Sequence, residues 1–270
     1  MTVELVDKIL DCYPSIRKVN FCGYGETLLG RNFPAIVNHL LDRGKNVIVI
    51  TNGIRVLRMK YKIPWSKITT RISLNEVTRA TYKESTGVDR FHDVVNALKW
   101  LRSIGANVRV SFKVSCQDIE RARDYIAFAS RYPGLSIALV PISDYTDGKD
   151  FETWSKHAFF CDDAHSHLFF DSCRKFASDR RVEVASWPIS VPRSGPPAPG
   201  ATCQWPFRNI VVDGSGNVTT CCRPSDESQN ICDVGEKAWY SPELEALRDG
   251  VAKGGEHMPK MCWQCIAKEY

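Results

Sequence analysis

Residues 46–51 read Asn-Val-Ile-Val-Ile-Thr, a short apolar run that sets the fold expected for most of the chain. A strand that is apolar on both sides is typical of a parallel sheet, whose two faces are both covered. Comparable β-rich runs surround it, and we expect further strands at residues 18–22, 67–74, 108–114 and 135–140. Residues 181–187 are compatible with one more strand.

Amphipathic helices separate these expected strands. Apolar residues recur at helical spacing near the start of the chain, between Asn32 and Gly44, between Asp89 and Gly105, and after Asp118. Asparagine and aspartate favour helix starts, and glycine favours helix ends. Strands that alternate with helices predict an α/β fold with a parallel sheet and right-handed crossovers.

Polar and glycine-rich residues follow the expected strands. The three that carry most information are Cys22-Gly-Tyr-Gly-Glu-Thr27, Thr51-Asn-Gly53 and Ser73-Leu-Asn75. Ligands of parallel sheets bind beyond the carboxyl ends of the strands, so we expect a binding site at this edge. Glycines leave backbone amides open to a ligand, and Glu26 could pair with a ligand ammonium group. A tight strand-to-helix turn without any ligand would use the same residues.

Composition narrows the class of protein. The chain has 270 residues and a formal net charge of +5, too mild and too scattered to indicate nucleic-acid binding. A weakly basic face could still attract a phosphorylated or acidic substrate. No apolar run is long enough for a membrane span, and the first residues do not form a signal peptide. We therefore expect a cytoplasmic protein, in which the eleven cysteines indicate metal ligands or buried thiols rather than disulfides.

The composition changes near residue 188. Residues 188–200 hold five prolines and two glycines, as expected of a linker between a domain at 1–187 and a smaller one at 201–270. In the smaller domain, residues 207–212 and 218–221 flank a turn and predict a β-hairpin. Residues 243–251 predict a short helix.

Four cysteines of the second domain are candidate metal ligands. Cys203 and Cys221 flank the predicted hairpin, and Cys262 and Cys265 form a C-x2-C pair near the end of the sequence. The pair can grip one metal from a single turn, and two such halves make a four-thiolate site. This donor set suits a structural zinc ion or an iron–sulfur cluster, and the spacing does not separate the two.

Other cysteines are weaker candidates. Cys232 is an alternative fourth ligand, and Cys222 should face away from Cys221. A C-x3-H-x-H-x5-C group runs from Cys161 to Cys173. We interpret it as surface histidines with two buried thiols rather than a zinc site.

These residues together resemble the radical S-adenosylmethionine (SAM) family. The stretch at residues 19–30, VNFCGYGETLLG, is similar to the family's "GGE" turn, which holds the amino group of SAM and corresponds to Gly23, Gly25 and Glu26. The ends at Asn52 and at Ser73 and Asn75 resemble the family's next two strand ends, of which the second lies near the SAM carboxylate and ribose. The resemblance implies a partial (βα)n barrel.

The second domain resembles the family's SPASM/twitch extension. Twelve residues separate Cys203 from Gly216, and four more separate Gly216 from Cys221, as in the extension's C-x(9–15)-G-x4-C hallmark. With Cys262 and Cys265, the resemblance implies one auxiliary [4Fe–4S] cluster. It also implies an electron donor such as flavodoxin or ferredoxin, and a small-molecule or peptide substrate that loses a hydrogen atom to a radical derived from SAM.

The sequence departs from the family in one respect. Family members carry C-x3-C-x2-C after their first strand for the SAM-cleaving [4Fe–4S] cluster, and no such motif occurs in these 270 residues. We expect SAM and this second cluster only in an intact form, so the sequence indicates a truncated enzyme or a chain without SAM cleavage. An alternative is a non-catalytic iron–sulfur or zinc-binding module. Without a first strand, residues 18–22 should form an open sheet edge and lower the solubility of the chain.

Overall fold

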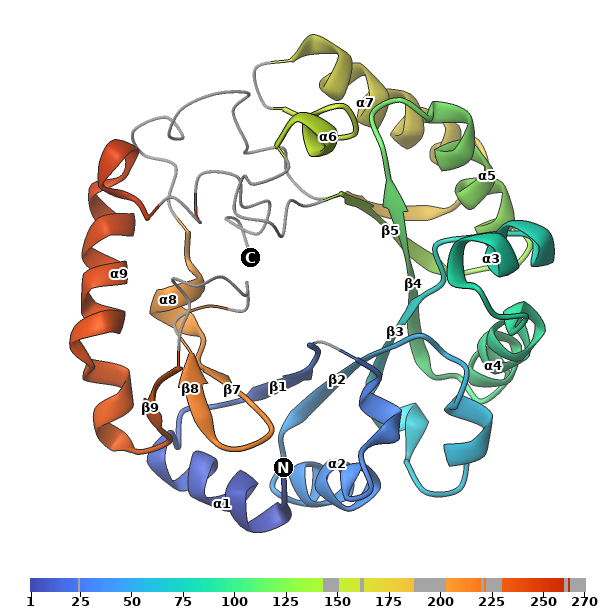
Figure 1. Ribbon diagram of the computed structural model, residues 1–270. Coiled ribbons are helices and arrows are strands. Elements are labelled where there is room, and N and C mark those ends of the chain that lie inside the picture. The colour runs from blue at the N-terminus through green and yellow to red at the C-terminus, as the bar shows by residue number, and fades with distance from the viewer. Residues whose placement is uncertain are drawn as a thin grey trace.

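The sheet anticipated from the sequence is present in the computed structural model, which describes residues 1–23, 25–142, 151–160, 163–186, 203–219, 221, 230–259 and 262. Six parallel strands lie side by side in chain order. They are β1 (Lys18–Phe21), β2 (Asn46–Thr51), β3 (Thr69–Ser73), β4 (Asn107–Val114), β5 (Ser136–Pro141) and β6 (Glu183–Ser186). The sheet curves into an incomplete barrel with helices outside it, which confirms the α/β prediction (Figure 1).

Helices cover the outer face of the sheet. They are α1 (Val3–Cys12), α2 (Phe33–Asp42), α3 (Arg79–Thr86), α4 (Phe91–Ser103), α5 (Ile119–Ala129) and α7 (Ala164–Ser178). A further short helix, α6 (Phe151–Ser155), follows β5 in the chain. Alternate strand residues such as Val47, Val49 and Ile72 point outward and join one large apolar cluster with the helices. Residues between them, such as Ile48 and Arg71, belong to the inner face of the barrel.

Three helix starts test the capping residues expected from the sequence. The Asp118 carboxylate accepts a hydrogen bond from the N–H of Arg121 and caps α5, as expected. Asn32 holds the N-cap position of α2, as expected, but its side chain makes no cap bond, and its amide lies 3.5 Å from the Met1 carbonyl instead. The predicted cap by Asp89 is wrong, because its carboxylate pairs with Arg79 and Arg90 holds the N-cap position of α4.

The second domain contains a small antiparallel sheet of β7 (Val211–Val212), β8 (Asn217–Thr219) and β9 (Asn230–Asp233). The hairpin prediction is correct, but its strands are shorter than expected. Phe207 lies in a helical turn, α8 (Trp205–Arg208), because Pro206 suits the first turn of a helix. The helix predicted at 243–251 is α9 (Pro242–Lys253). The predicted linker at 188–200 lies outside the described residues.

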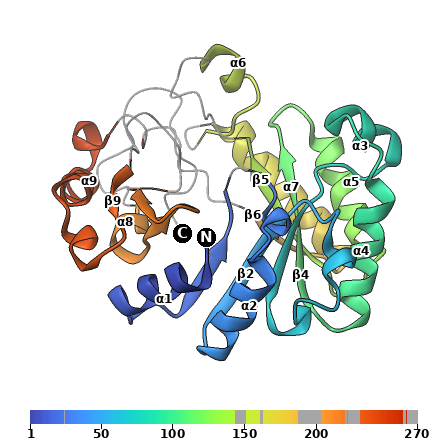
Figure 2. The ribbon, with the colours of Figure 1, turned by 60° about the horizontal axis from the view of Figure 1, so that its bottom comes forward.

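Helix α1 packs against both sheets. Val6 and Leu10 join the large apolar cluster, whereas Leu5 and Ile9 pack against the cluster formed by Tyr13, Val218, Val234 and Ala238. The Tyr13 hydroxyl also donates a 2.6 Å hydrogen bond to the carbonyl of Gly235. Figure 2 shows α1 between β1 and the hairpin.

Strand β1 is an edge of the large sheet, as predicted, because within the described residues it pairs only with β2. Its free edge borders a cavity rather than another strand. Across the described ranges, no helix combines the length and apolarity needed to cross a bilayer.

Candidate functional site

The turn after β1 exposes backbone, as expected of a ligand-binding turn. Gly23 and Gly25 have φ values of 147° and 93°, which favour glycine over residues with a side chain. A Cβ atom added at either position would meet nothing within 4 Å. The two glycines are therefore required by the backbone path and not by crowding, and space beside them is open.

The Glu26 carboxylate joins the carboxyl ends of β1 and β2. Its Oε1 accepts hydrogen bonds from the Thr51 hydroxyl at 2.6 Å and the N–H of Leu28 at 3.1 Å. Its Oε2 accepts one from the N–H of Asn52 at 2.8 Å. A carboxylate offers about four acceptor positions, so one remains on Oε2. Glu26 thus has a structural role in the turn and keeps capacity for one ligand donor.

Asn52 and Ser73 lie at the same level of the sheet. Thr51 is paired with Ile72, and Ser73 is paired with Ser111 on the next strand. The Asn52 side chain accepts a hydrogen bond from the N–H of Ile54, which fixes the loop after β2. The structure therefore brings the predicted residues of β1, β2 and β3 to one edge.

Asn75 is held in an uncommon conformation after β3. Its φ of 60° lies in the left-handed region, which asparagine tolerates better than most residues. Its side-chain oxygen accepts from the N–H of Lys113 at 3.1 Å, and its carbonyl accepts from the Tyr125 hydroxyl at 2.8 Å. These bonds tie the end of β3 to β4 and α5.

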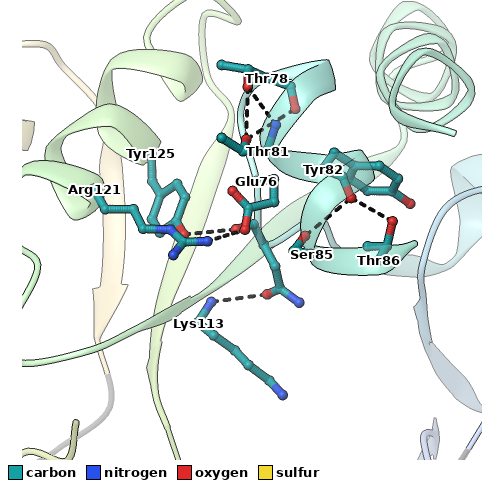
Figure 3. A network of polar contacts seen from close by, with 10 residues as sticks. Glu76, Thr78, Thr81, Tyr82, Ser85, Thr86, Lys113, Arg121 and Tyr125 are labelled. Carbon is teal, nitrogen blue, oxygen red and sulfur yellow. Dashed lines mark hydrogen bonds and ion pairs between the residues drawn. The ribbon is translucent and has the colours of Figure 1, made fainter. Parts of the chain in front are cut away.

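A buried polar cluster beside Asn75 was not predicted. Glu76 is 4% exposed and forms an ion pair with Arg121, while the ring of Tyr125 stacks on Phe112 at 4.2 Å (Figure 3). Burial raises the pKa of Tyr125 to about 12, so its hydroxyl stays protonated and able to donate. The cluster holds the end of β3 in place. In Figure 3 the Lys113 side chain points away from the cluster.

Two residues of α3 beside this edge, Arg79 and Tyr82, have structural roles. Arg79 pairs with Asp89 through both carboxylate oxygens. Tyr82 is 3% exposed and packs against Phe91. Neither contributes to the edge that holds Glu26.

A cavity of about 1920 Å³ connects the glycine turn with the second domain. Its lining includes Cys22 and Gly23 on one side and Trp205, Arg208 and Cys221 on the other. The two sites predicted independently from the sequence therefore border one space.

Three of the four predicted cysteine ligands share one small apolar cluster. Cys203 and Cys262 are each 9% exposed, and the partly buried Cys221 packs against the same cluster, beside α9. Cys265 lies outside the described residues, as do Cys222 and the side chain of Cys232. Within the described ranges, no three side chains of His, Cys, Asp or Glu lie close enough together to hold one metal ion. The cysteines are the right donors for a thiolate site, and three of them share one apolar cluster. The described cysteines alone do not form a complete metal site.

Gly216, the glycine of the spacing hallmark, has a clear physical role. Its φ is 100°, and a Cβ atom there would approach the Leu5 side chain to 3.1 Å. Glycine therefore lets the hairpin turn lie directly on α1.

The group from Cys161 to Cys173 includes residues with ordinary roles. Cys173 is fully buried, and burial raises the pKa of its thiol to about 11. His165 is exposed and hydrogen-bonds the carbonyl of Cys116. Cys161 lies outside the described residues.

Comparisons with known proteins give a consistent picture. No protein-family model matches the chain. A probable GTP 3′,8-cyclase of Sulfolobus acidocaldarius is 28% identical over 240 residues, which is 86% of this chain and 74% of the relative. A probable GTP 3′,8-cyclase of Saccharolobus islandicus is 28% identical over 150 residues, 54% of this chain and 48% of the relative. The chain thus spans about half the length of the Saccharolobus islandicus relative and about three quarters of the one from Sulfolobus acidocaldarius.

Solved structures share the fold. Streptococcus suis SuiB bound to its precursor peptide SuiA superposes with a TM-score of 0.68 at 15% identity, covering 92% of this chain and 60% of SuiB. Native anSMEcpe with bound AdoMet and Cp18Cys peptide gives 0.66 at 15% identity, covering 97% and 77%. These similarities in sequence and in fold support the predicted radical SAM superfamily. The SPASM/twitch assignment stays a prediction.

Proposed function

We propose that this radical SAM protein binds SAM at the carboxyl ends of β1–β3 and carries an auxiliary [4Fe–4S] cluster in its second domain. The observation that carries the proposal is the Glu26 carboxylate, fixed between two strand ends beside the open glycine turn. Its remaining acceptor position suits the ammonium group of SAM. Asn52, Ser73 and Asn75 lie along the same edge and would contact the rest of the ligand. SAM is bound in the similar SuiB and anSMEcpe structures.

The cluster ligands in this proposal are Cys203, Cys221, Cys262 and Cys265. Support comes from the shared apolar surroundings of the first three and from the C-x2-C spacing of the last two. An auxiliary cluster, when bound, supplies a site for substrate binding or for electron uptake. The shielding of the Cys203 and Cys262 side chains keeps water from such a group.

The substrate is a small molecule or a peptide that lies in the cavity between the two domains. Both classes occur among similar proteins, since GTP 3′,8-cyclases are named for a nucleotide and the anSMEcpe and SuiB structures contain peptides. Gly23 and Cys221 border the same cavity, so substrate held there would lie between SAM and the auxiliary cluster. The reaction in an intact form would oxidise or modify the substrate by removal of a hydrogen atom, with electrons from a flavodoxin or ferredoxin.

A second candidate function is a binding or electron-transfer protein without SAM cleavage. The sequence favours it in one respect, because the 270 residues contain no C-x3-C-x2-C motif. For this chain alone we therefore expect SAM binding and no formation of 5′-deoxyadenosine.

Anaerobic reconstitution with iron and sulfide tests the cluster. We expect about four irons per chain and broad visible absorbance, both lost when Cys262 and Cys265 are replaced by Ala. Cys22→Ala, which changes an exposed cysteine in the other domain, should keep the iron. About one tightly bound zinc and no colour would replace the iron–sulfur proposal with a structural zinc site.

Equilibrium dialysis with SAM tests the other half of the proposal. Glu26→Gln should weaken SAM binding about tenfold or more, because a charge-assisted hydrogen bond is lost. Glu256→Gln, at an exposed position in the second domain, serves as the matched control. Equal affinity in wild type and Glu26→Gln would reject the assigned site.

A further inference from the structure

The inner face of the six-stranded sheet is positively charged. The strands contain four cations, and alternation places all of them on the face that points away from the covering helices. These cations are Lys18, Arg71, Arg109 and Lys113. Among the described residues of these six strands, the one carboxylate is Glu183. The described strand residues therefore give this face of the partial barrel an excess of positive charge.

Two of the cations are direct neighbours. Arg71 on β3 and Arg109 on β4 are register partners in the parallel ladder. Neighbouring strands lie about 4.8 Å apart, so both side chains leave the sheet at nearly the same place. Two like charges in register are unfavourable unless an anion lies between them. The pair is half-buried, which makes the repulsion larger than on an open surface.

Protein groups neutralise this pair only in part. Arg109 donates to the Ser136 hydroxyl at 3.2 Å and lies 3.7 Å from Glu183, whose side chain is 73% exposed. An ion pair of that length and exposure contributes little and exchanges easily. The Arg71 guanidinium has no hydrogen bond or ion pair with any residue of the described ranges. Five guanidinium donors are thus available on Arg71.

The charge of Arg71 acts toward the glycine turn. Desolvation by neighbouring atoms raises the pKa of the Cys22 thiol, and the nearby Arg71 guanidinium opposes that rise. Cys22 directly precedes Gly23, so Arg71 lies on the inner side of the edge assigned to SAM. Ser73, two residues later on the same strand and face, belongs to that edge itself.

We propose that Arg71 and Arg109 form an oxyanion site on the inner face of the barrel, and that the substrate of this protein carries a phosphate or carboxylate group. The substrate assignment rests on the function proposed above, whereas the anion site does not. Planar guanidinium forks match both kinds of oxyanion with two parallel hydrogen bonds. Lys18 and Lys113 lie toward the two ends of the same face and would raise the local concentration of anions.

Calorimetric titration with sodium pyrophosphate and, separately, with citrate tests the site at fixed ionic strength. Wild type should bind at least one of the two probes, and Arg71→Gln should weaken that binding about tenfold or more. Arg71→Lys should recover part of the affinity, since the charge remains and the fork is lost. Arg58→Gln is the matched control, because Arg58 is exposed in the 3-10 helix Val56–Met59, away from the inner face. Circular dichroism and melting curves establish that each variant is folded.

The pattern of binding assigns the group. Tight pyrophosphate binding with weak citrate binding indicates a phosphate, and the reverse indicates a carboxylate. Absence of binding to both probes, or equal losses in Arg71→Gln and Arg58→Gln, overturns the proposal. The titration requires neither SAM nor iron, so its failure leaves the SAM site standing. If SAM does not bind while anion binding still depends on Arg71, only the proposed radical SAM function is rejected.

Discussion

The two domains differ in how much apolar surface each one buries. The sheet domain buries about forty side chains in one cluster that includes Trp65, Leu101 and Phe112. Among the residues that the structure describes, the second domain has two small clusters, one of six buried residues that include Cys203 and Cys262, and one of four that includes Tyr13 from the other domain. Small cores rarely offset the entropy of ordering a chain without a crosslink or a metal. The cysteines of the second domain are therefore expected to stabilise its fold, in addition to any part in chemistry.

The largest expected effect is unfolding of the second domain when its proposed [4Fe–4S] cluster is removed. Cys262→Ser should lose iron and make residues 203–262 sensitive to protease, while residues 1–142 stay resistant. Metal binding to a site that forms only on folding is worth on the order of 10 kcal/mol, more than the small apolar clusters supply. Limited proteolysis with mass spectrometry of the fragments measures the difference.

Cys22→Ser is the control for this experiment, because Cys22 is exposed in the sheet domain and outside the cysteine cluster. Its cleavage pattern should match that of wild type. An iron-free Cys262→Ser chain that resists protease throughout would show that the two domains do not differ in this way.

A matched pair of leucine truncations should give a smaller effect that separates the domains. Leu101 is fully buried in the sheet domain, and Leu247 is 8% exposed beside the cysteines. Leu101→Ala should lower the free energy of unfolding of the sheet domain by about 2–5 kcal/mol and leave iron content unchanged. Leu247→Ala should reduce iron retention and leave the unfolding of the sheet domain unchanged. Urea unfolding and iron analysis of both variants decide; the same response from both would mean that one cooperative core spans the molecule.

The smallest effect concerns alkaline pH and belongs to the sheet domain. Tyr125 has a pKa of about 12 in the folded protein and about 10 when unfolded. The Tyr125 hydroxyl keeps its proton to a higher pH in the folded state than in the unfolded state. Its contribution to the free energy of unfolding is therefore complete below pH 10 and is lost as the pH rises toward 12. The free energy of unfolding should fall by about 1 kcal/mol between pH 9 and pH 11 from this residue.

Urea unfolding at these two pH values checks the assignment. Tyr125→Phe should lack this part of the pH dependence, and it should be less stable at neutral pH because the Asn75 carbonyl loses its partner. Tyr61→Phe changes a side chain that is 89% exposed and should behave as wild type. An unchanged slope in Tyr125→Phe would assign the alkaline loss to other groups.

Local sequence signals were sufficient for the sheet. The run at 46–51 is β2 residue for residue, because alternation and β-branched side chains act over a few neighbours. The glycine turn and the residues at the strand ends were predicted for the same reason, since a parallel sheet places all its carboxyl ends at one edge. Helix caps were less reliable: Asp89 has the right chemistry for a cap and instead pairs with Arg79, ten residues away in sequence.

Contacts between distant residues were missed. Glu76 pairs with Arg121 across 45 positions, and Tyr125 reaches Asn75 across 50, so no local pattern announces either contact. A partial signal existed, because a carboxylate next to a strand end seldom lies buried without a partner. The pairing of Arg71 with Arg109 also required the register, which a sequence pattern does not supply.

Helix α1 has a consequence for synthesis on the ribosome. The Tyr13 hydroxyl and its partner in the second domain are 222 positions apart. At about 5–20 residues per second, roughly 10–45 seconds pass between the emergence of α1 and that of its partner. During this time the apolar side chains of Leu5 and Ile9 have no hairpin to cover them. The nascent chain therefore carries an exposed apolar helix while these 222 positions are translated, which is the kind of segment that a ribosome-associated chaperone binds.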